Sequence, residues 1–223
     1  MRPVLNLPLM SLLSSDLVSA MTAAGRTILF EDGRTIHARG ADQPGLSVIL
    51  SGRVRFGVFS EEGAYYYTGL LNEGHCFGEA TLFADMPRAY HADAVGETTV
   101  LSLTKTAFNR LFDDRPDFAR AFLSTLTSRL YEALDFADDL RRLSLEAKVV
   151  KQLFRIQRVG GFEDDSLPIR QIDLAYALGV SRVSVGKALE RLQARGLIQL
   201  GYGEIRVLDR KRLAESITDK TGL

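Results

Sequence analysis

The sequence predicts an α+β protein in which an antiparallel β-roll is followed by a long helix and a winged helix-turn-helix. Three observations support this prediction. Short alternating apolar runs separated by glycines occupy about residues 26–104, as in compact antiparallel sheets. An apolar seam with alternating steps of three and four runs from Leu123 to Leu140. A helix, a glycine turn, a second helix and a small hairpin then follow.

Charge divides the chain in the same way. The 28 basic and 28 acidic residues cancel overall, but residues 1–140 carry a net charge of −6 and residues 141–223 carry +6. A basic second part indicates a polyanionic partner. Together with the three observations above, it predicts a β-roll domain over residues 1–110, a long helix over 111–143 and a winged helix-turn-helix over 144–223.

Composition argues against several classes of protein. No apolar run approaches the roughly 20 residues that cross a bilayer, and the first ten residues do not resemble a signal peptide. We therefore expect a cytoplasmic protein with no membrane partner. Cys76 is the only cysteine, so neither an internal disulfide nor a four-cysteine cluster is expected. His37, His75 and His91 are too dispersed for a metal signature, and no catalytic triad or carboxylate pair is evident. We therefore expect that the protein is not an enzyme.

The first elements follow from capping and turn residues. Ser14 can cap a short helix that Gly25 ends. Within the strands that follow, Ser51-Gly52 and Glu61-Glu62-Gly63 predict hairpin turns. Residues 77–89 interrupt the roll with its one helical turn.

The long helix is predicted to start near Pro116, which fits a first-turn position after Asp113-Asp114. A seam as narrow as this one suits pairing with a second copy of the chain, and predicts a homodimer. The alternative is a helix packed on the roll of its own chain. The seam consists of Leu123, Leu126, Leu130, Ala133, Ala137 and Leu140.

The last part of the chain contains the elements of a winged helix-turn-helix. Gly179 marks the turn between its two helices, and Ser181 is the predicted N-cap of the second. The predicted segments are a helix over 145–158, a polar break over 160–166, a helix ending at Leu178, a second helix to about Arg195, and strands at 198–200 and 204–207.

Residues 77–89 carry groups suited to a phosphate. Backbone N–H groups at a helix start, with the guanidinium of Arg88 brought back over them, can bind one phosphate. Glu79 adds an acceptor suited to a ribose hydroxyl. The segment therefore predicts a site for a small phosphorylated nucleotide.

The second helix of the helix-turn-helix offers polar and basic side chains in its first turns. In this motif those positions meet base edges in the major groove, where arginine can bind guanine O6 and N7 together. Val183 is suited to a thymine methyl group. The alternative is a helical hairpin with a solvated basic face. The candidate DNA-binding residues are Gln171, Ser181, Arg182, Val183, Ser184 and Lys187.

Four segments occur together in an order that resembles one family: Gly45–Arg55, residues 77–89, the seam helix and Gly179–Lys187. From about residue 9 onward the chain resembles the cyclic-AMP receptor protein/fumarate-nitrate regulator (Crp/Fnr) family of bacterial transcription factors. The resemblance implies a cyclic-nucleotide-binding-domain-like roll, a dimerising helix and a winged helix that binds double-stranded DNA at a two-fold operator. It also implies that the effector reorients the DNA-reading helices, and it implies RNA polymerase as a partner.

The resemblance implies roles for individual residues. Glu79 would contact the ribose 2′-hydroxyl and Arg88 the cyclic phosphate, and backbone amides near Gly78, Glu79 and Ala89 would complete the site, with Arg129 near the ligand. Ala89 stands where the bacterial receptor has a serine. The receptor's adenine-reading Thr-Ser pair aligns with Ala133-Leu134, which cannot hydrogen-bond a base. The expected effector is therefore cAMP or cGMP, and no metal, haem or iron–sulfur cluster is expected.

Three alternatives stay open at this point. Glu79 and Arg88 could pair with each other, as in relatives that bind no nucleotide. The chain could be a regulator of the same family with a different effector or none. It could also be a barrel enzyme with a basic tail.

Overall fold

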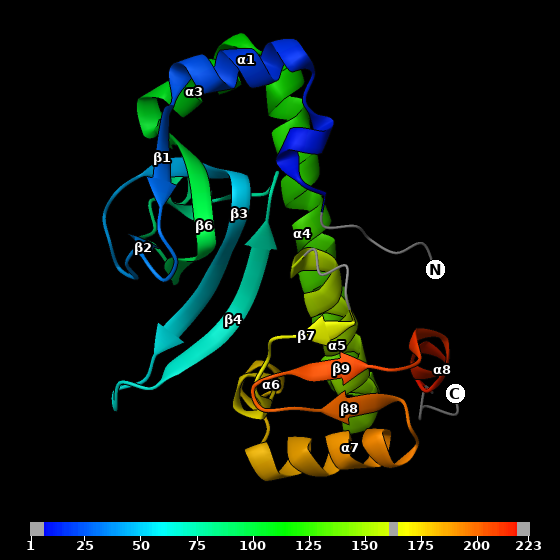
Figure 1. Cartoon of the computed structure of the whole chain (residues 1–223). Coiled ribbons are helices and arrows are strands. Elements are labelled where there is room, and N and C mark those ends of the chain that lie inside the picture. The colour runs from blue at the N-terminus through cyan, green and yellow to red at the C-terminus, as the bar shows by residue number, and fades with distance from the viewer. Residues whose placement is uncertain (1–6, 161–164, 218–223) are drawn as a thin grey trace. The chain divides into compact units, whose positions relative to one another are not determined.

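The structure is a computed structural model that describes residues 7–160 and 165–217 (Figure 1). Contacts along the chain divide it into two compact units. Unit 1 comprises Met1–Val58 and Leu70–Ala133, and unit 2 comprises Phe59–Gly69 and Leu134–Leu223. The α+β class is confirmed.

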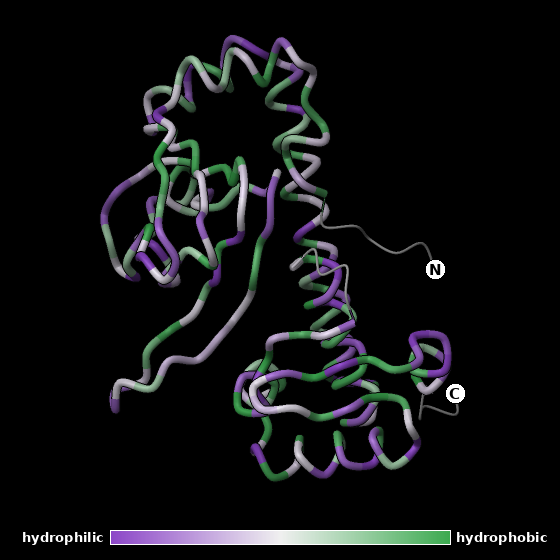
Figure 2. Tube along the Cα trace, in the orientation of Figure 1, coloured by the Kyte–Doolittle hydropathy of each residue, from purple (hydrophilic) through white to green (hydrophobic). Residues whose placement is uncertain are grey.

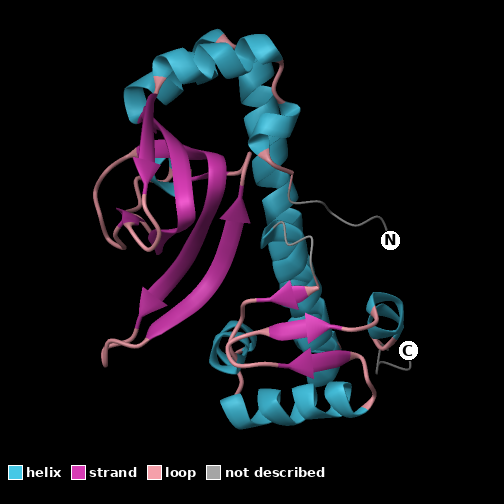
Figure 3. Ribbon diagram, in the orientation of Figure 1, coloured by secondary structure: helices cyan, strands magenta, loops and turns pink. Residues whose placement is uncertain are grey.

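The first part of the chain forms an antiparallel roll with helices before and after it (Figure 3). The strand order is β1-β6-β3-β4, with β2 paired to β6 and β5 paired to β3. The elements are a 3-10 helix at Leu9–Leu12, α1 Ser15–Ala24, β1 Arg26–Phe30, β2 Thr35–His37, β3 Gly45–Phe59, β4 Tyr65–Asn72, β5 Cys76–Phe77, α2 Ala80–Phe83, β6 His91–Thr104, α3 Lys105–Asp114 and α4 Pro116–Arg142.

Strand β3 separates two apolar clusters because successive side chains point to opposite faces. Leu46 and Val48 join the cluster that also contains Phe108 and Phe122 of the helices. Ile49 joins the other cluster, with Phe77, Ala92 and Val100. Phe77 of the second cluster directly precedes Gly78 and Glu79 in the chain.

The predicted hairpin turn at Ser51-Gly52 is wrong. Strand β3 runs through both residues, and its pairing with β6 shifts register on either side of Ser51. Gly52 has φ +82°, and a Cβ there would lie 2.5 Å from the carbonyl oxygen of Glu97. The glycine therefore makes a bulge in a continuous strand. The turn at Glu61-Glu62-Gly63 is confirmed, since it joins β3 to β4.

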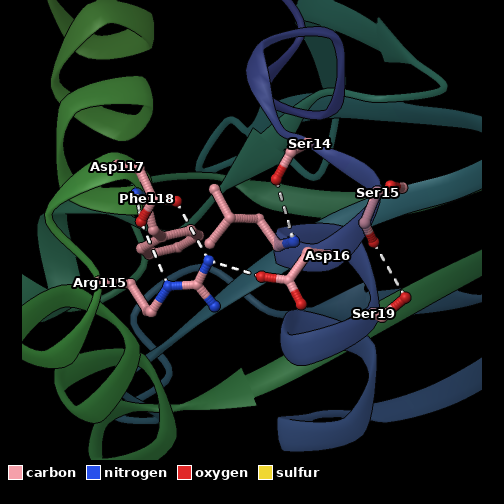
Figure 4. Close-up of polar contacts among 8 residues, drawn as sticks. Ser14, Ser15, Asp16, Ser19, Arg115, Asp117 and Phe118 are labelled. Carbon is pink, nitrogen blue, oxygen red and sulfur yellow. Dashed lines mark hydrogen bonds and ion pairs between the residues drawn. The ribbon is translucent and has the colours of Figure 1, made fainter.

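Helix α1 is tied to the start of α4 by one arginine (Figure 4). The Ser14 hydroxyl accepts a hydrogen bond from the Leu17 amide, which confirms the predicted cap. Arg115, between α3 and α4, donates from Nη2 to Asp16 at 2.8 Å and to Asp117 at 3.1 Å. Helix α4 begins at the next residue, Pro116, as the sequence predicts.

The predicted seam of α4 is only partly open to solvent. Leu126 packs against the roll cluster, and Leu140 packs against the core of unit 2. Leu123 and Leu130 of the seam are 52% and 58% exposed, and Leu134, which lies outside the predicted seam, is 57% exposed. We call these three residues the open stripe of α4.

Unit 2 contains the predicted winged helix-turn-helix, built around buried side chains of α5, α6 and α7. Gly179 has φ +64°, which is the left-handed turn expected there. Figure 2 shows hydrophilic and hydrophobic residues alternating along α7. The predicted break over 160–166 lies partly outside the described residues. The elements are α5 Leu145–Gly160, β7 Ser166–Leu167, α6 Gln171–Leu178, α7 Arg182–Ala194, β8 Ile198–Leu200, β9 Ile205–Val207 and α8 Arg210–Glu215.

Among the helices of the described residues, none combines the length and the apolar character that crossing a bilayer requires.

Candidate functional site

Arg88 is a buried cation without a counter-ion. Arg88 as a whole residue is only 7% exposed. Nη2 donates to the backbone carbonyls of Gln43 at 2.9 Å and Gly45 at 3.0 Å, but Nε and Nη1 are buried and have no partner. Burial lowers the pKa of Arg88 from its ordinary value, although the charge of Glu79 opposes this shift. Such a group is costly to bury and is suited to receive an anion.

Gly78 allows Arg88 to adopt this position. It has φ +101°, and a Cβ at Gly78 would lie 1.8 Å from Nη1 of Arg88 and 2.6 Å from the carbonyl oxygen of Gly45. Any side chain here would displace the guanidinium. The predicted roles of Gly78 and Arg88 are therefore linked by packing.

Glu79 pairs with Arg129 and not with Arg88. The distance from Nη1 of Arg129 to Oε1 of Glu79 is 2.7 Å, and Nη2 of Arg129 donates to the Cys76 carbonyl at 2.5 Å. The alternative in which Glu79 and Arg88 neutralise each other is therefore wrong. Arg129 holds the Glu79 carboxylate at the edge of the roll, where Glu79 stays partly exposed.

The remaining predicted ligand residues offer no side-chain hydrogen bond. Ala89 is exposed directly after Arg88, so only its backbone can contact a ligand. Ala133 and Leu134 are also exposed, and both are apolar. The structure thus brings Gly78, Glu79, Arg88 and Arg129 into the same region of unit 1.

His37 is a polar residue of the roll that sequence reasoning did not select as a ligand residue. Its Nε2 lies 2.9 Å from Oγ of Ser47, and its ring meets the ring of Phe77 edge-on. Nδ1 is buried and has no partner. Burial, with a contribution from the charge of Arg88, lowers the pKa of His37 to about 4. A lone histidine at the end of a short strand gives no sequence signal that its side chain is buried with an unpaired ring nitrogen.

Cys76 has the properties of a core residue. It is fully buried, and burial raises the pKa of its thiol to about 11. The thiol is therefore neutral near pH 7, which makes it a poor nucleophile. Over the part of the chain that the structure describes, no group of three or more metal-binding side chains occurs.

The first turn of α7 presents the predicted DNA-reading side chains. Ser181 caps the helix by accepting a hydrogen bond from the Ser184 amide at 3.1 Å. Arg182 and Lys187 are exposed, and Val183 is 68% exposed. A helix whose N-terminal side chains are free in this way can enter the major groove.

Gln171 of α6 and two arginines near the C-terminal end of α7 make contacts within unit 2. Gln171 is only half-exposed, and a Cβ on Gly186 would lie 3.4 Å from its Oε1, so it packs at the contact between α6 and α7. Arg191 and Arg195 both pair with Glu146 of α5, at 3.2 Å and 2.5 Å. The basic surface of α7 is therefore narrower than its sequence indicates.

Unit 2 also contains a contact that the sequence did not reveal. Asp173 of α6 is 4% exposed and accepts hydrogen bonds from the Tyr67 amide at 3.2 Å and from Arg170 at 2.7 Å. The rings of Tyr66 and Tyr176 stack with centroids 4.7 Å apart. The end of the β3–β4 hairpin is thereby fastened to the first helix of the helix-turn-helix.

Comparison with known proteins identifies a relative of each of the two parts of the chain. A family model described as cyclic nucleotide-binding domain matches residues 27–115, and one described as Crp-like helix-turn-helix domain matches residues 147–216. The chain is 31% identical over 190 residues to the cyclic AMP receptor protein of Thermus thermophilus, covering 84% of this chain and 86% of that protein.

Two further similarities extend over most of the chain. It is 29% identical over 202 residues to a CRP-like cAMP-activated global transcriptional regulator of Mycobacterium tuberculosis, covering 88% of this chain and 90% of that one. The fold resembles that of the c-di-GMP responsive global regulator CLP of Xanthomonas campestris, with a TM-score of 0.73, 19% identity and coverage of 88% and 100%.

Proposed function

The chain belongs to the Crp/Fnr family of transcription regulators, and on that premise we propose that it is a homodimer whose operator affinity is controlled by a cyclic nucleotide bound in the β-roll. The family consists of transcription regulators, so the enzyme alternative is set aside. The observation that carries the proposal is Arg88, a buried cation with two donor atoms left without a partner. As a DNA-binding regulator, the protein is expected to act in the cytoplasm and with RNA polymerase.

A cyclic phosphate would supply what Arg88 lacks. Its negative charge would compensate the buried guanidinium, and its oxygens would accept from Nε and Nη1. Glu79, held by Arg129, would accept from the ribose 2′-hydroxyl. The backbone near Gly78 and Ala89 would line the phosphate. These four contacts use a cyclic nucleotide's phosphate and sugar and leave its base unread.

Calorimetric titration with cAMP and with cGMP tests the proposal. We expect heat of binding with at least one of them and only a small preference between the two, because Ala133 and Leu134 offer no hydrogen bond to distinguish the bases. The nucleotide that gives heat of binding should also raise the affinity of the protein for its operator. Absence of heat with both, together with intact operator binding, would eliminate nucleotide control.

That last outcome would favour a second candidate, a regulator of the same family with a different effector or none. One observation supports it: Glu79 has a partner within the protein, since Nη1 of Arg129 lies 2.7 Å from its Oε1. A constitutive regulator should bind its operator equally well with and without either nucleotide.

For DNA reading, we expect the substitution Arg182→Ala to relax sequence preference. Arg182 is exposed at the first position of α7, where it can reach a guanine edge. Losing that contact should cost about 1–3 kcal/mol of discrimination in each half-site. Dissociation constants for operators that differ at single base pairs, measured at fixed salt for the wild type and the variant, give this free energy of discrimination.

Arg191→Ala is the matched control because Arg191 lies on the same helix but pairs with Glu146. It should leave the order of preference among operators unchanged. An Arg182→Ala variant with unchanged preference at every base pair would show that Arg182 does not read sequence.

For the dimer, we expect Leu130→Glu to shift the protein toward monomers. The open stripe of α4 leaves Leu130 58% exposed, and a two-fold contact would place two new carboxylates close together in an apolar interface. Sedimentation measures the change. Leu29→Glu, at a 60% exposed leucine of β1, is the control. A dimer that survives Leu130→Glu would place the interface elsewhere.

A groove beside the stripe is consistent with a second copy of the helix as its occupant. It lies along the first turns of α4 and is lined by Phe112, Pro116, Ala119, Arg120, Leu123, Ser124 and Thr127. In such a dimer α4, which carries residues of both units, would link ligand binding to the two DNA-reading helices. The ligand must then favour one dimer geometry over the other.

A further inference from the structure

Arg88 and His37 are two side chains of the roll whose buried nitrogen atoms have no hydrogen-bond partner among the described residues, and of these two only Arg88 has a predicted role. We propose that His37 is a second phosphate-binding residue, whose Nδ1–H donates a hydrogen bond to an oxygen of the same phosphate that Arg88 binds. The inference rests on the proposed cyclic-nucleotide function and adds a ligand contact that the family resemblance does not supply.

Strand pairing brings His37 and Arg88 to the same corner of the roll. His37 ends β2 and contacts Ser47, which pairs in register with Phe77 of β5. Gly45, two residues before Ser47 on β3, accepts from Arg88 through its carbonyl at 3.0 Å. His37 also meets the ring of Phe77, the residue directly before Gly78. Both side chains thus contact β3, and they lie against consecutive residues, His37 against Phe77 and Arg88 against Gly78.

The chemistry of His37 suits a neutral donor beside a cation. With the pKa of His37 at about 4, because of burial and then the charge of Arg88, the imidazole is uncharged near pH 7. A neutral imidazole carries one proton, and the Ser47 hydroxyl can donate to Nε2 so that the proton resides on Nδ1. A phosphate oxygen favours this tautomer because it can only accept.

A neutral histidine also avoids placing a second unpaired positive charge beside Arg88, since the other arginine of this region, Arg129, is paired with Glu79. Two buried positive charges side by side would repel each other, and each would lack solvation before the ligand arrives. Arg88 supplies the charge, and His37 adds a hydrogen bond without a further charge. The bound phosphate would then satisfy all three unpartnered donor positions, Nδ1 of His37 and Nε and Nη1 of Arg88.

Three substitutions separate the two ring nitrogens of His37. His37→Asn keeps an amide donor near the position of Nδ1, whereas His37→Gln reaches toward Ser47 in place of Nε2 and leaves the Nδ1 position empty. His37→Phe keeps the ring and removes both nitrogens. Calorimetric dissociation constants for cAMP and cGMP are compared for these variants and the wild type, and melting temperatures without ligand confirm that each variant is folded.

We expect His37→Gln and His37→Phe to bind nucleotide roughly tenfold or more weakly, as for loss of one hydrogen bond to a charged acceptor. His37→Asn should retain most of the affinity. Folded Gln and Phe variants with wild-type affinity would overturn the proposal while leaving the nucleotide function intact. If the wild type itself binds neither nucleotide, the proposed function fails and this inference fails with it.

A ring-specific readout distinguishes contact from mere packing. In nitrogen-edited NMR spectra of the full chain labelled at histidine, the Nδ1 resonance of His37 should move to that of a hydrogen-bonded protonated nitrogen when nucleotide is added. Its assignment follows from its loss in His37→Gln. An unchanged Nδ1 resonance at saturating nucleotide would show that His37 does not touch the phosphate.

Discussion

Replacing Arg88 by Met is expected to weaken cyclic-nucleotide binding by roughly a hundredfold or more, since two hydrogen bonds to a charged acceptor are lost together. The ligand-free protein should keep nearly the same stability. Arg88 gives up two bonds to the carbonyls of Gln43 and Gly45, but the variant no longer buries a charge without a counter-ion. These two effects oppose each other.

Thermal unfolding with and without nucleotide measures both parts of this prediction. Nucleotide should raise the melting temperature of the wild type, because a ligand that binds only the folded state stabilises it, and should not raise that of Arg88→Met. Arg26→Met is the control, since Arg26 is an exposed arginine on β1. A large loss of stability in Arg88→Met without ligand would mean that Arg88 is primarily a structural residue.

Replacing Asp173 by Ala is expected to destabilise unit 2 by about 2–4 kcal/mol, because one buried carboxylate serves several donors at once. Asp173 accepts from the Tyr67 amide and from the backbone and side chain of Arg170, including Nη2 at 2.8 Å. It therefore completes the cap of α6 as well as the contact with the hairpin. Alanine would remove the acceptor of the Tyr67 amide and the carboxylate of the capping box of α6.

Hydrogen exchange locates the effect of Asp173→Ala. The Tyr67 amide should exchange much faster in the variant, since its acceptor is gone, and denaturant unfolding should give the loss of free energy. Asp209→Ala is the matched control, because Asp209 caps α8 through the single bond from Arg212 at 3.0 Å; its cost should be near 1 kcal/mol. Equal costs for the two variants would show that the hairpin contact contributes nothing.

Much of this protein can be predicted from short stretches of its sequence. Ser14, Gly179 and Ser181 lie at the helix ends they were expected to form, because caps and turns depend on a few neighbouring residues. The candidate sites at residues 77–89 and in the first turn of α7 were predicted in the same way. Ser51-Gly52 was misassigned because a glycine with positive φ serves a bulge as well as a turn.

What the tertiary structure decided is which side chains meet. Arg129 and Glu79 are 50 residues apart in the chain, and Tyr67 and Asp173 are 106 apart. No local pattern encodes such pairs, since they depend on how separate elements pack. From the sequence alone, through its resemblance to the family, Arg88 could be predicted as a candidate phosphate-binding residue. Only the fold determined that Glu79 pairs elsewhere, and that Arg88 therefore lies buried without a counter-ion.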